Sequence, residues 1–334
     1  MIIPVSLGEK SYDVVVEKGA LKNIDKYVDL NRKVLVITDD GVPSIYAKTV
    51  LDKCQDGYLF IIEQGENSKS LDTFGDILTA MLKFGFTRKD CVIAVGGGVV
   101  GDLSGFVASS FMRGVDFINI PTTTLSQIDS AVGGKTAVNL NGVKNVVGAF
   151  YQPKKVIVDI DTLATLPTRH FFNGYAEGIK MAVTFDSQLF ELIEKNNAYS
   201  IIEEVIKKSI IAKKTVVEQD EKEQGLRKIL NYGHTVGHGI ESTNFGKIFH
   251  GEAVALGMLA MSSTKVRDRL ITVLKNNNLI KDVSYNWEKI EEAISHDKKS
   301  QGNKITTVQV EEIGTYLFVD MDIDGIISKA KETL

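Results

Sequence analysis

The stretch CVIAVGGGVVGDLSGFVA, residues 91–108, decides the fold class. Its apolar run at 91–95 predicts a buried strand, and the residues after the glycines predict a helix. Gly96, Gly98 and Gly101 match the pattern G-x-G-x-x-G, whose backbone amides can approach a pyrophosphate at a helix N-terminus. A glycine turn that binds nothing gives the same pattern, and here the pattern follows a late strand, not the first. The stretch therefore predicts a Rossmann-like α/β fold of atypical order.

Short β-branched runs on either side of this stretch extend the prediction. Residues 2–7 and 12–16 are typical of an opening hairpin, and residues 71–84 of an amphipathic helix. Further buried strands are expected at 34–38, 58–62, 91–95 and 117–120. Strands that alternate with helices indicate a mostly parallel sheet. One of these strands ends in Asp39 and Asp40, carboxylates that can accept hydrogen bonds from a ribose.

The distribution of proline and glycine divides the chain. All five prolines lie at or before Pro167, and 17 of the 29 glycines precede Ala149. Because proline interrupts helices and glycine serves turns, we expect an α/β domain at 1–155 and a mainly α-helical domain at 156–334. Helices are expected at 171–195, 201–218 and 251–270, and a late hairpin at 304–319 with Gly314 at its turn.

Composition excludes several classes of protein. The chain has 334 residues, a net charge of −4, 43% hydrophobic and 25% charged residues, as in globular proteins and unlike disordered ones. Its mild acidity argues against a nucleic-acid partner. Two cysteines cannot build a disulfide framework, and we find neither a signal peptide nor an apolar stretch of membrane-spanning length. We therefore expect a cytoplasmic protein without a membrane or nucleic-acid partner.

The segment AVGGKTAV around Lys135 contains GKT but is not a P-loop. That motif needs a glycine five residues before Gly134, and Asp129 stands there. Lys135 can still meet a phosphate as a point charge, although a surface lysine in a turn is the simpler interpretation.

Three of the five histidines lie within 17 positions, in LNYGHTVGHGIE and IFHGEAVALGM. His234 and His238 share a face if their segment is helical, and His250 follows across a short loop. Converging imidazoles suit zinc or a similar divalent ion, which a carboxylate would complete. The carboxylate can be Glu177, Glu241 or Glu252, and spacing alone does not choose between them.

Scattered basic and amide groups beside the glycine-rich turns can form a cradle for a phosphorylated substrate. They are Arg113, Lys144, Asn145, Lys213, Arg227 and Asn231. Glu177 and Lys180 are three residues apart on an expected helix and can form an ion pair.

Read in order, these blocks resemble the 3-dehydroquinate synthase family of sugar-phosphate cyclases. The matching stretches are GGGVVGDLSGFVASSFMRGV, IPTTTLSQIDSAVGGKTAVN, GVKNVVGAFYQP, GYAEGIK, GLRKILNYGHTVGHGIE, HGEAVALGM and HDKK. They run from Gly96 to Lys299. The resemblance implies an NAD-binding α/β domain and a helical metal-binding domain, with the active site in the cleft between them.

The activity implied by the resemblance is that of a carbon–oxygen lyase. It converts 3-deoxy-D-arabino-heptulosonate 7-phosphate to 3-dehydroquinate and phosphate, the second step of the shikimate pathway toward aromatic amino acids. NAD oxidises a hydroxyl held by zinc or cobalt, phosphate is eliminated, and NADH returns the hydride. The alternatives are another sugar-phosphate cyclase or a metal-dependent polyol or glycerol phosphate dehydrogenase. A third alternative is a non-enzymatic nucleotide-binding module. It would require that the candidate metal-binding and phosphate-binding residues match the family's pattern only by chance.

The resemblance also assigns residues. The metal ligands it implies are Glu177, His234 and His250, which leaves His238 on the substrate side. The NAD contacts it implies are Asp39, Glu66, Lys69, Gly96, Gly97, Gly98, Asp102, Thr122, Thr123, Asp129, Lys135, Lys144 and Thr165. The substrate contacts are Arg113, Asp129, Lys135, Asn145, Lys180, Lys213, Arg227, Asn231, His238 and one of Lys298 and Lys299. Catalytic roles fall to Lys135, Lys180, His238, Asn145, Asp129 and Arg113, and Arg113 reaches the partner's site in a homodimer.

Overall fold

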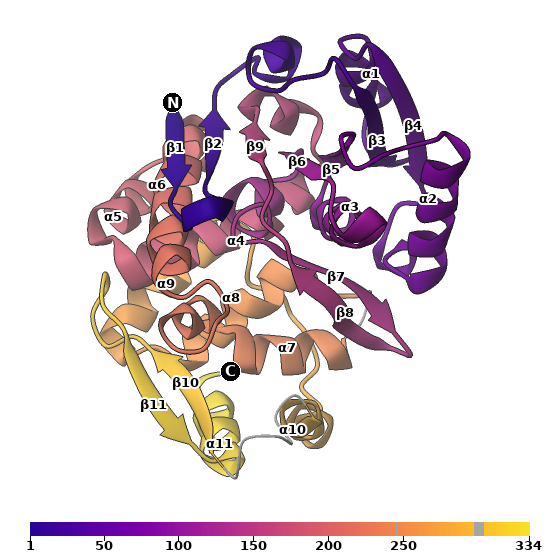
Figure 1. Ribbon diagram of the computed structural model, residues 1–334. Coiled ribbons are helices and arrows are strands. Elements are labelled where there is room, and N and C mark those ends of the chain that lie inside the picture. Colours follow the sequence, from indigo (N-terminus) through magenta and orange to yellow (C-terminus); the bar gives the residue numbers. More distant parts are fainter. Residues whose placement is uncertain (245, 297–303) are drawn as a thin grey trace. The chain divides into compact units, whose positions relative to one another are not determined.

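The computed structural model describes the whole chain except residues 245 and 297–303 (Figure 1). The chain forms two compact units, Met1–Pro167 and Thr168–Leu334. The strand at Lys155–Val158 belongs to the first unit, whose sheet thus continues past the division that we placed after residue 155.

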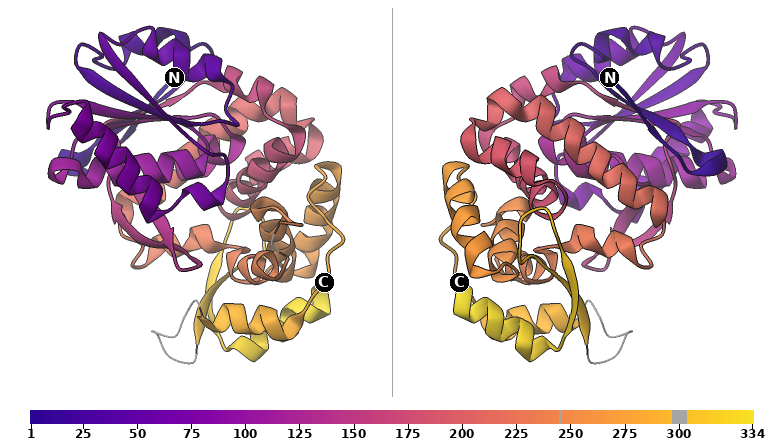
Figure 2. Two further views of the ribbon diagram at one scale, coloured as in Figure 1. Left: turned by 90° about the vertical axis from the view of Figure 1, so that its right-hand side faces the viewer. Right: turned by 90° about the vertical axis from the view of Figure 1, so that its left-hand side faces the viewer.

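A seven-stranded sheet forms the first unit, in the order β1-β2-β9-β6-β5-β3-β4. Its strands are β1 (Ile2–Val5), β2 (Tyr12–Val16), β3 (Lys33–Asp39), β4 (Asp56–Ile62), β5 (Cys91–Gly96), β6 (Asp116–Pro121) and β9 (Lys155–Val158). Only β1 runs antiparallel to its neighbour, and the other pairs are parallel. The predicted hairpin and the mostly parallel sheet are confirmed, and Figure 2 shows the twist of the sheet.

Both faces of this sheet are buried at its central strands, which explains their continuous apolar runs. Val34 and Val36 point to one face, under the 3₁₀ segment Leu21–Lys26 and helix α1 (Ser44–Leu51). Leu35 and Ile37 point to the other face, under α2 (Leu71–Lys83) and α3 (Gly98–Ser110). Successive side chains of β3 thus enter two hydrophobic cores in turn, one on each side of the sheet.

The order of the strands reverses between β3 and β5. From β3 the chain crosses to β4 at one edge, whereas from β5 it crosses to β6 on the opposite side. Such a switch point opens a crevice at the carboxyl ends of the two strands, where open α/β sheets bind ligands. The loops that follow β3 and β5 therefore meet where a ligand is expected.

A second, two-stranded sheet, which we did not predict, follows the GKT motif. Strand β7 (Lys135–Leu140) pairs with β8 (Val143–Phe150), and Gly133 and Gly134 enter it at φ values of 103° and 67°. A P-loop would instead continue into a helix. The exclusion of a triphosphatase is therefore consistent with the local structure.

The second unit consists of helices and one hairpin. The helices are α4 (Thr168–Phe185), α5 (Ser187–Lys195), α6 (Ala198–Gln219), α7 (His234–Thr243), α8 (His250–Ala260), α9 (Thr264–Asn276), α10 (Trp287–His296) and α11 (Ile323–Thr333). Strands β10 (Ile305–Gln309) and β11 (Leu317–Met321) form the predicted hairpin, with Gly314 at φ 88°. No helix in the described parts of the chain combines the length and apolar character needed to cross a membrane.

Two of the predicted helices are each interrupted. Residues 171–195 divide between α4 and α5 at Asp186, whose side chain accepts a hydrogen bond from Leu189 N at 2.9 Å. Residues 251–270 divide between α8 and α9, where Ser263 caps the new helix at Val266 N. The prediction of continuous helices was wrong because apolar spacing persists across a break, while the capping residue starts a new helix axis.

Candidate functional site

Close helix packing in the second unit brings one carboxylate and three histidines together. A Cβ on Gly257 of α8 would overlap the carbonyl oxygen of Gly233, just before α7. A Cβ on Gly251 would likewise overlap the carbonyl oxygen of Asn173 on α4. Glycine at both positions lets the backbones touch. The start of α7 thus lies against the second half of α8, and the start of α8 lies against α4.

The side chains from these three helices converge on Glu177. Its Oε1 atom lies 3.4 Å from Nε2 of His250 and 3.6 Å from Nε2 of His234. The ring of His238 lies 5.2 Å from that of His234 and 5.6 Å from that of His250, measured between centroids. One turn along α4, the Nζ atom of Lys180 lies 2.5 Å from Oε2 of Glu177.

Glu177 carries a charge in a buried environment. Its side chain is 1% exposed, and among the described residues neither oxygen accepts a hydrogen bond of regular geometry. Burial alone would raise the pKa of Glu177, but Lys180 and the two neighbouring histidines hold it well below its usual range. The carboxylate is therefore ionised at neutral pH, with Oε1 facing two imidazole nitrogens.

The two histidines that face Glu177 differ in their electrostatic environment. Burial and the Lys180 ammonium hold the pKa of His234 well below its usual range. Burial also opposes protonation of His250, but Glu177 and Glu241 overcome it and raise the pKa to about 9. Without a metal, His234 is thus neutral at pH 7 and His250 is cationic.

This donor set fits a divalent metal ion. Ligand atoms of a tetrahedral zinc centre with bonds of about 2.1 Å lie roughly 3.4 Å apart. The contacts of Glu177 Oε1 with both histidines are close to that separation. His238 also belongs to the cluster, since one nitrogen from each of the three histidines lies within 4.8 Å of the others. Distances alone thus allow either Glu177 or His238 beside the other two.

The structure distinguishes the three candidate carboxylates that spacing left open. Glu252 receives two hydrogen bonds from Arg169, at 2.9 and 2.8 Å, and a third from Phe249 N. It therefore caps α8. Glu241 Oε2 lies 3.0 Å from Nδ1 of His250, on the opposite side of that ring from Glu177. Of the three, Glu177 alone faces two histidines.

The remaining predicted substrate residues of this unit lie around the 3₁₀ segment η7 (Leu226–Asn231). Lys180 Nζ donates to Leu230 O at 2.7 Å, which ties this segment to α4. Arg227 is buried and donates to Glu221 O at 2.6 Å, whereas Asn231 is exposed and donates to Glu223. Lys213 is buried on α6, which packs against η7. Lys298 and Lys299 lie outside the described residues.

In the first unit, the predicted NAD residues gather at the carboxyl ends of the parallel strands. Asp39 ends β3, Gly96 ends β5, and Thr122 follows β6. The amide of Thr122 donates to Gly96 O at 2.9 Å, so these two strand ends adjoin. Gly97 precedes α3, and no described side chain caps this helix. Free amides at a helix N-terminus at the switch point fit a pyrophosphate.

Several of the predicted NAD contacts already have partners within the chain. The Asp39 carboxylate accepts hydrogen bonds from the amides of Gly41 and Val42 at 2.9 and 3.0 Å. Burial raises the pKa of Asp39, and these amides offset part of that effect. Thr123 exchanges hydrogen bonds with Ser126 in the turn that leads to Asp129.

Lys69 links the cofactor residues to the β7–β8 hairpin. It is 4% exposed, donates to Asp102 Oδ2 at 2.5 Å and also donates to Asn145 Oδ1. Glu66 accepts a 2.7 Å bond from Asn139 of the same hairpin. The segment after β4 thus holds the hairpin tip beside α3.

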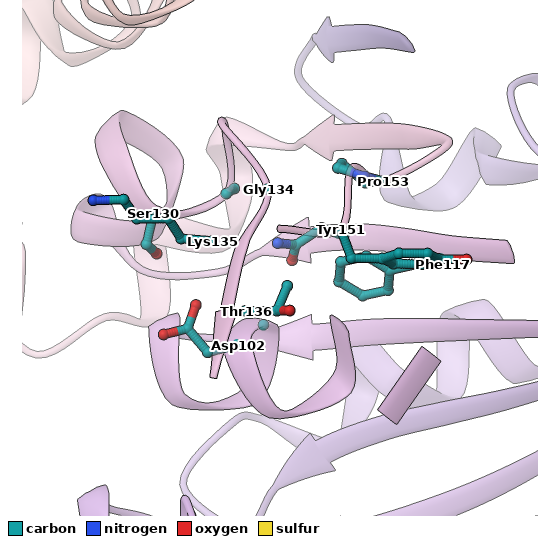
Figure 3. A pocket seen from close by; sticks show the side chains of 11 residues that line it. Asp102, Phe117, Ser130, Gly134, Lys135, Thr136, Tyr151 and Pro153 are labelled. Carbon is teal, nitrogen blue, oxygen red and sulfur yellow. The ribbon is translucent and has the colours of Figure 1, made fainter. Parts of the chain in front are cut away.

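A small recess in this unit is lined by Asp102, Asn119, Ser130, Lys135 and Thr136, with the rings of Phe117 and Tyr151. Figure 3 shows Asp102, Ser130 and Lys135 grouped on one side and Phe117 on the other. Lys135, predicted to meet a phosphate, thus borders the same recess as Asp102, predicted to contact NAD.

Three further predicted residues, Thr165, Lys144 and Arg113, are also absent from the lining of this recess. Thr165 bonds to the Tyr46 hydroxyl at 2.8 Å, and Lys144 is exposed near the tip of the hairpin. Arg113 is exposed and follows Met112 in two successive left-handed conformations, with φ values of 71° and 47°.

Sequence reasoning missed the residues that position the candidate metal ligands. Asn173 Oδ1 accepts a 2.6 Å bond from Gly251 N, next to His250, and Tyr232 O lies 3.1 Å from Nδ1 of His234. The four-residue spacing of Asn173 and Glu177 places both on one face of α4, a signal that was available. Nothing in the sequence indicated the role of a backbone carbonyl.

The comparisons with known proteins cover most of the chain. The family model "3-dehydroquinate synthase N-terminal" matches residues 59–173, and "3-dehydroquinate synthase C-terminal" matches residues 174–300. A 3-dehydroquinate synthase from Alkaliphilus metalliredigens is 41% identical over 323 aligned positions, covering 91% of each chain.

Two solved structures share the fold over nearly their full lengths. A 2-deoxy-scyllo-inosose synthase, complexed with carbaglucose-6-phosphate, NAD⁺ and Co²⁺, has a TM-score of 0.92 at 25% identity, with complete coverage of both chains. The 2-epi-5-epi-valiolone synthase of Streptomyces hygroscopicus, with NAD⁺ and Zn²⁺ bound, has a TM-score of 0.89 at 28% identity, covering 98% of each. Because identity is higher to 3-dehydroquinate synthases, nothing favours the alternative cyclase.

Proposed function

Since this chain belongs to the 3-dehydroquinate synthase family, we propose which of its residues carry that family's reaction. The chain is an enzyme, a phosphate-eliminating cyclase that uses NAD and a divalent metal in aromatic amino-acid biosynthesis. The observation that carries the residue assignment is the convergence of Glu177, His234 and His250 beside the buried Lys180.

Glu177, His234 and His250 hold the metal, which we propose to be zinc, with cobalt as a substitute. When bound, the ion acts as a Lewis acid toward a substrate hydroxyl or carbonyl. Glu177 supplies the negative charge that a divalent ion needs in a buried site, and Tyr232 O orients His234. Lys180 balances Glu177 and presents a cation to an anionic substrate.

His238 is the substrate-side imidazole of this centre. It is exposed, while His234 and Glu177 are enclosed. An accessible imidazole suits the transfer of a proton near neutral pH. Its position one turn beyond His234 on α7 keeps it next to the metal ligands without requiring it to be one.

The strand ends and the start of α3 bind NAD, which accepts a hydride and returns it when bound. Gly96, Gly97 and Gly98 let the pyrophosphate approach the uncapped amides of α3. Lys69 holds Asp102 and Asn145, and these three contact the cofactor or the substrate. The other NAD contacts that we propose are Asp39, Glu66, Thr122, Thr123, Asp129, Lys135, Lys144 and Thr165.

The phosphorylated sugar acid is bound by cations and amides. In the first unit we propose Asp129, Lys135 and Asn145, and in the second Lys213, Arg227 and Asn231, with one of Lys298 and Lys299. Their charge and hydrogen-bonding capacity match phosphate and carboxylate groups. We further propose a cytoplasmic homodimer in which Arg113 serves the partner's site.

One assay tests the reaction. The full-length protein with NAD and zinc should release phosphate from 3-deoxy-D-arabino-heptulosonate 7-phosphate, with many turnovers per NAD and no net NADH. Omission of the sugar phosphate is the blank, and glycerol with NAD tests the dehydrogenase alternative. Stoichiometric NADH from either substrate would contradict the proposal.

A further inference from the structure

His250 lies between two carboxylates that come from different helices. Its Nε2 atom lies 3.4 Å from Oε1 of Glu177 on α4, and its Nδ1 atom lies 3.0 Å from Oε2 of Glu241 on α7. Glu241 is 17% exposed, so the contact is partly shielded from water. Both ring nitrogens thus have an anionic neighbour.

The two nitrogens of a metal-binding histidine have different tasks. The ligating nitrogen needs a free lone pair, so the proton of the neutral ring must be on the other nitrogen. An acceptor for that proton fixes the tautomer and the orientation of the ring, and an anionic acceptor also makes the ring a stronger donor. In His250, Nε2 faces Glu177 and Nδ1 faces Glu241, which matches these two tasks.

His234 gives an internal comparison. Its Nε2 atom also faces Glu177, but its Nδ1 atom lies 3.1 Å from the backbone carbonyl oxygen of Tyr232. A backbone carbonyl is a neutral acceptor that no side-chain substitution removes. The two histidines are thus oriented by different groups: His234 by a backbone carbonyl, and His250 by a side-chain carboxylate that a substitution can remove.

We propose that Glu241 is a positioning residue of the metal centre, which accepts the Nδ1 proton of His250 and does not bind the metal. The inference rests on the proposed metal site and adds to it a residue that the sequence left as one of three candidate ligands. Glu252, the third candidate, is bound by Arg169 and Phe249 N and takes no part.

The proposal predicts graded losses of metal affinity. Glu241→Ala removes the acceptor and should weaken zinc binding about 10- to 100-fold, the usual effect of losing an outer-shell partner. Glu241→Gln keeps a neutral amide oxygen and should lose less. Glu177→Ala removes a ligand and should lose more than either. Asp268→Ala, which removes an exposed carboxylate from α9 of the same unit, should leave the affinity unchanged.

The experiment titrates full-length, metal-free protein with Zn²⁺ against a chromophoric chelator, and with Co²⁺ by its visible absorption. Thermal unfolding of the metal-free variants separates folding from affinity. Retention of the wild-type cobalt spectrum in Glu241→Ala, with weakened affinity and an unchanged metal-free Tm, supports the proposal. Wild-type affinity in Glu241→Ala overturns it, and metal loss equal to that of Glu177→Ala shows Glu241 to be a ligand instead. If the wild-type chain binds neither ion, the proposed metal site itself fails.

Discussion

Glu177 Oε1 lies 3.4 Å from His250 Nε2, although one residue is in the middle of α4 and the other begins α8. The contact depends on Gly251, whose missing side chain leaves room for the carbonyl oxygen of Asn173. A buried, ionised carboxylate without a regular hydrogen bond is costly unless a cation offsets it. Lys180 offsets the charge in part, and a divalent ion would complete the compensation.

Removing the metal should abolish activity without unfolding the protein. Lys180 still pairs with Glu177 on α4 when the metal is removed, so the buried carboxylate keeps a cation beside it. Treatment with a chelator should stop phosphate release, and zinc or cobalt should restore it. The control is the far-UV circular dichroism spectrum before and after chelation. Full activity in protein shown to contain no metal would refute the assignment.

His234 and His238 should respond differently to substitution. His234→Ala removes a ligand and should lose both metal and activity. His238→Asn should keep about one metal per subunit and lose roughly 10²- to 10⁴-fold in turnover, the usual contribution of a proton-transfer residue. Metal content and phosphate release are measured for both variants. Equal metal loss in the two would mean that His238 is a ligand as well.

Gly257→Ala should disrupt the metal site through packing alone. The added methyl group would overlap Gly233 O, so α7 and α8 must separate, at a cost of about 1–3 kcal/mol or more. Weaker zinc binding and a lower Tm are expected. Gly75→Ala in α2 is the matched control, since its Cβ would meet nothing within 4 Å. Because alanine favours helix, this control should be neutral or stabilising by about 0.5–1 kcal/mol.

Asp186→Ala should lower stability by about 0.5–2 kcal/mol through loss of the cap of α5. Burial opposes ionisation of Asp186, but the Leu189 amide and Lys208 hold its pKa below the ordinary value. This stabilisation is present above the unfolded-state pKa of about 3.9 and is lost as the pH falls through the lower folded-state value. Asp186→Asn keeps the cap but should reduce the acid dependence. Urea unfolding at pH 7 and pH 3 measures both, and identical pH dependence in all three proteins would contradict this account.

Arg113→Ala and Lys135→Ala should complement each other if Arg113 serves the partner's site. In an equal mixture with free exchange, half of the dimers are mixed and each contains one intact site, which gives about a quarter of wild-type activity. Each variant alone should be nearly inactive. Sedimentation shows whether dimers form, and full activity of a monomer would exclude the shared site.

The amino-acid sequence by itself determined the strands, most of the helices and the set of side chains that are candidates for binding metal, NAD and substrate. Continuous apolar runs specify the central strands because both faces of the sheet are buried there, and the glycines at 96–101 can be recognised because a close helix start needs them. The order of the motifs along the chain also indicated the family, because several separate motifs follow one another as they do in that family.

Only the tertiary structure decided which carboxylate faces the histidines. Glu177, Glu241 and Glu252 are equivalent in spacing arguments, but one faces two imidazoles, one holds the outer nitrogen of His250, and one caps a helix. Likewise, the helix breaks at Asp186 and Ser263 were not predicted, because the apolar spacing continues across them. That spacing indicates which face of a helix is buried but not where the helix axis changes direction. Contacts between distant segments depend on how closely backbones approach, and here Gly251 and Gly257 set that distance.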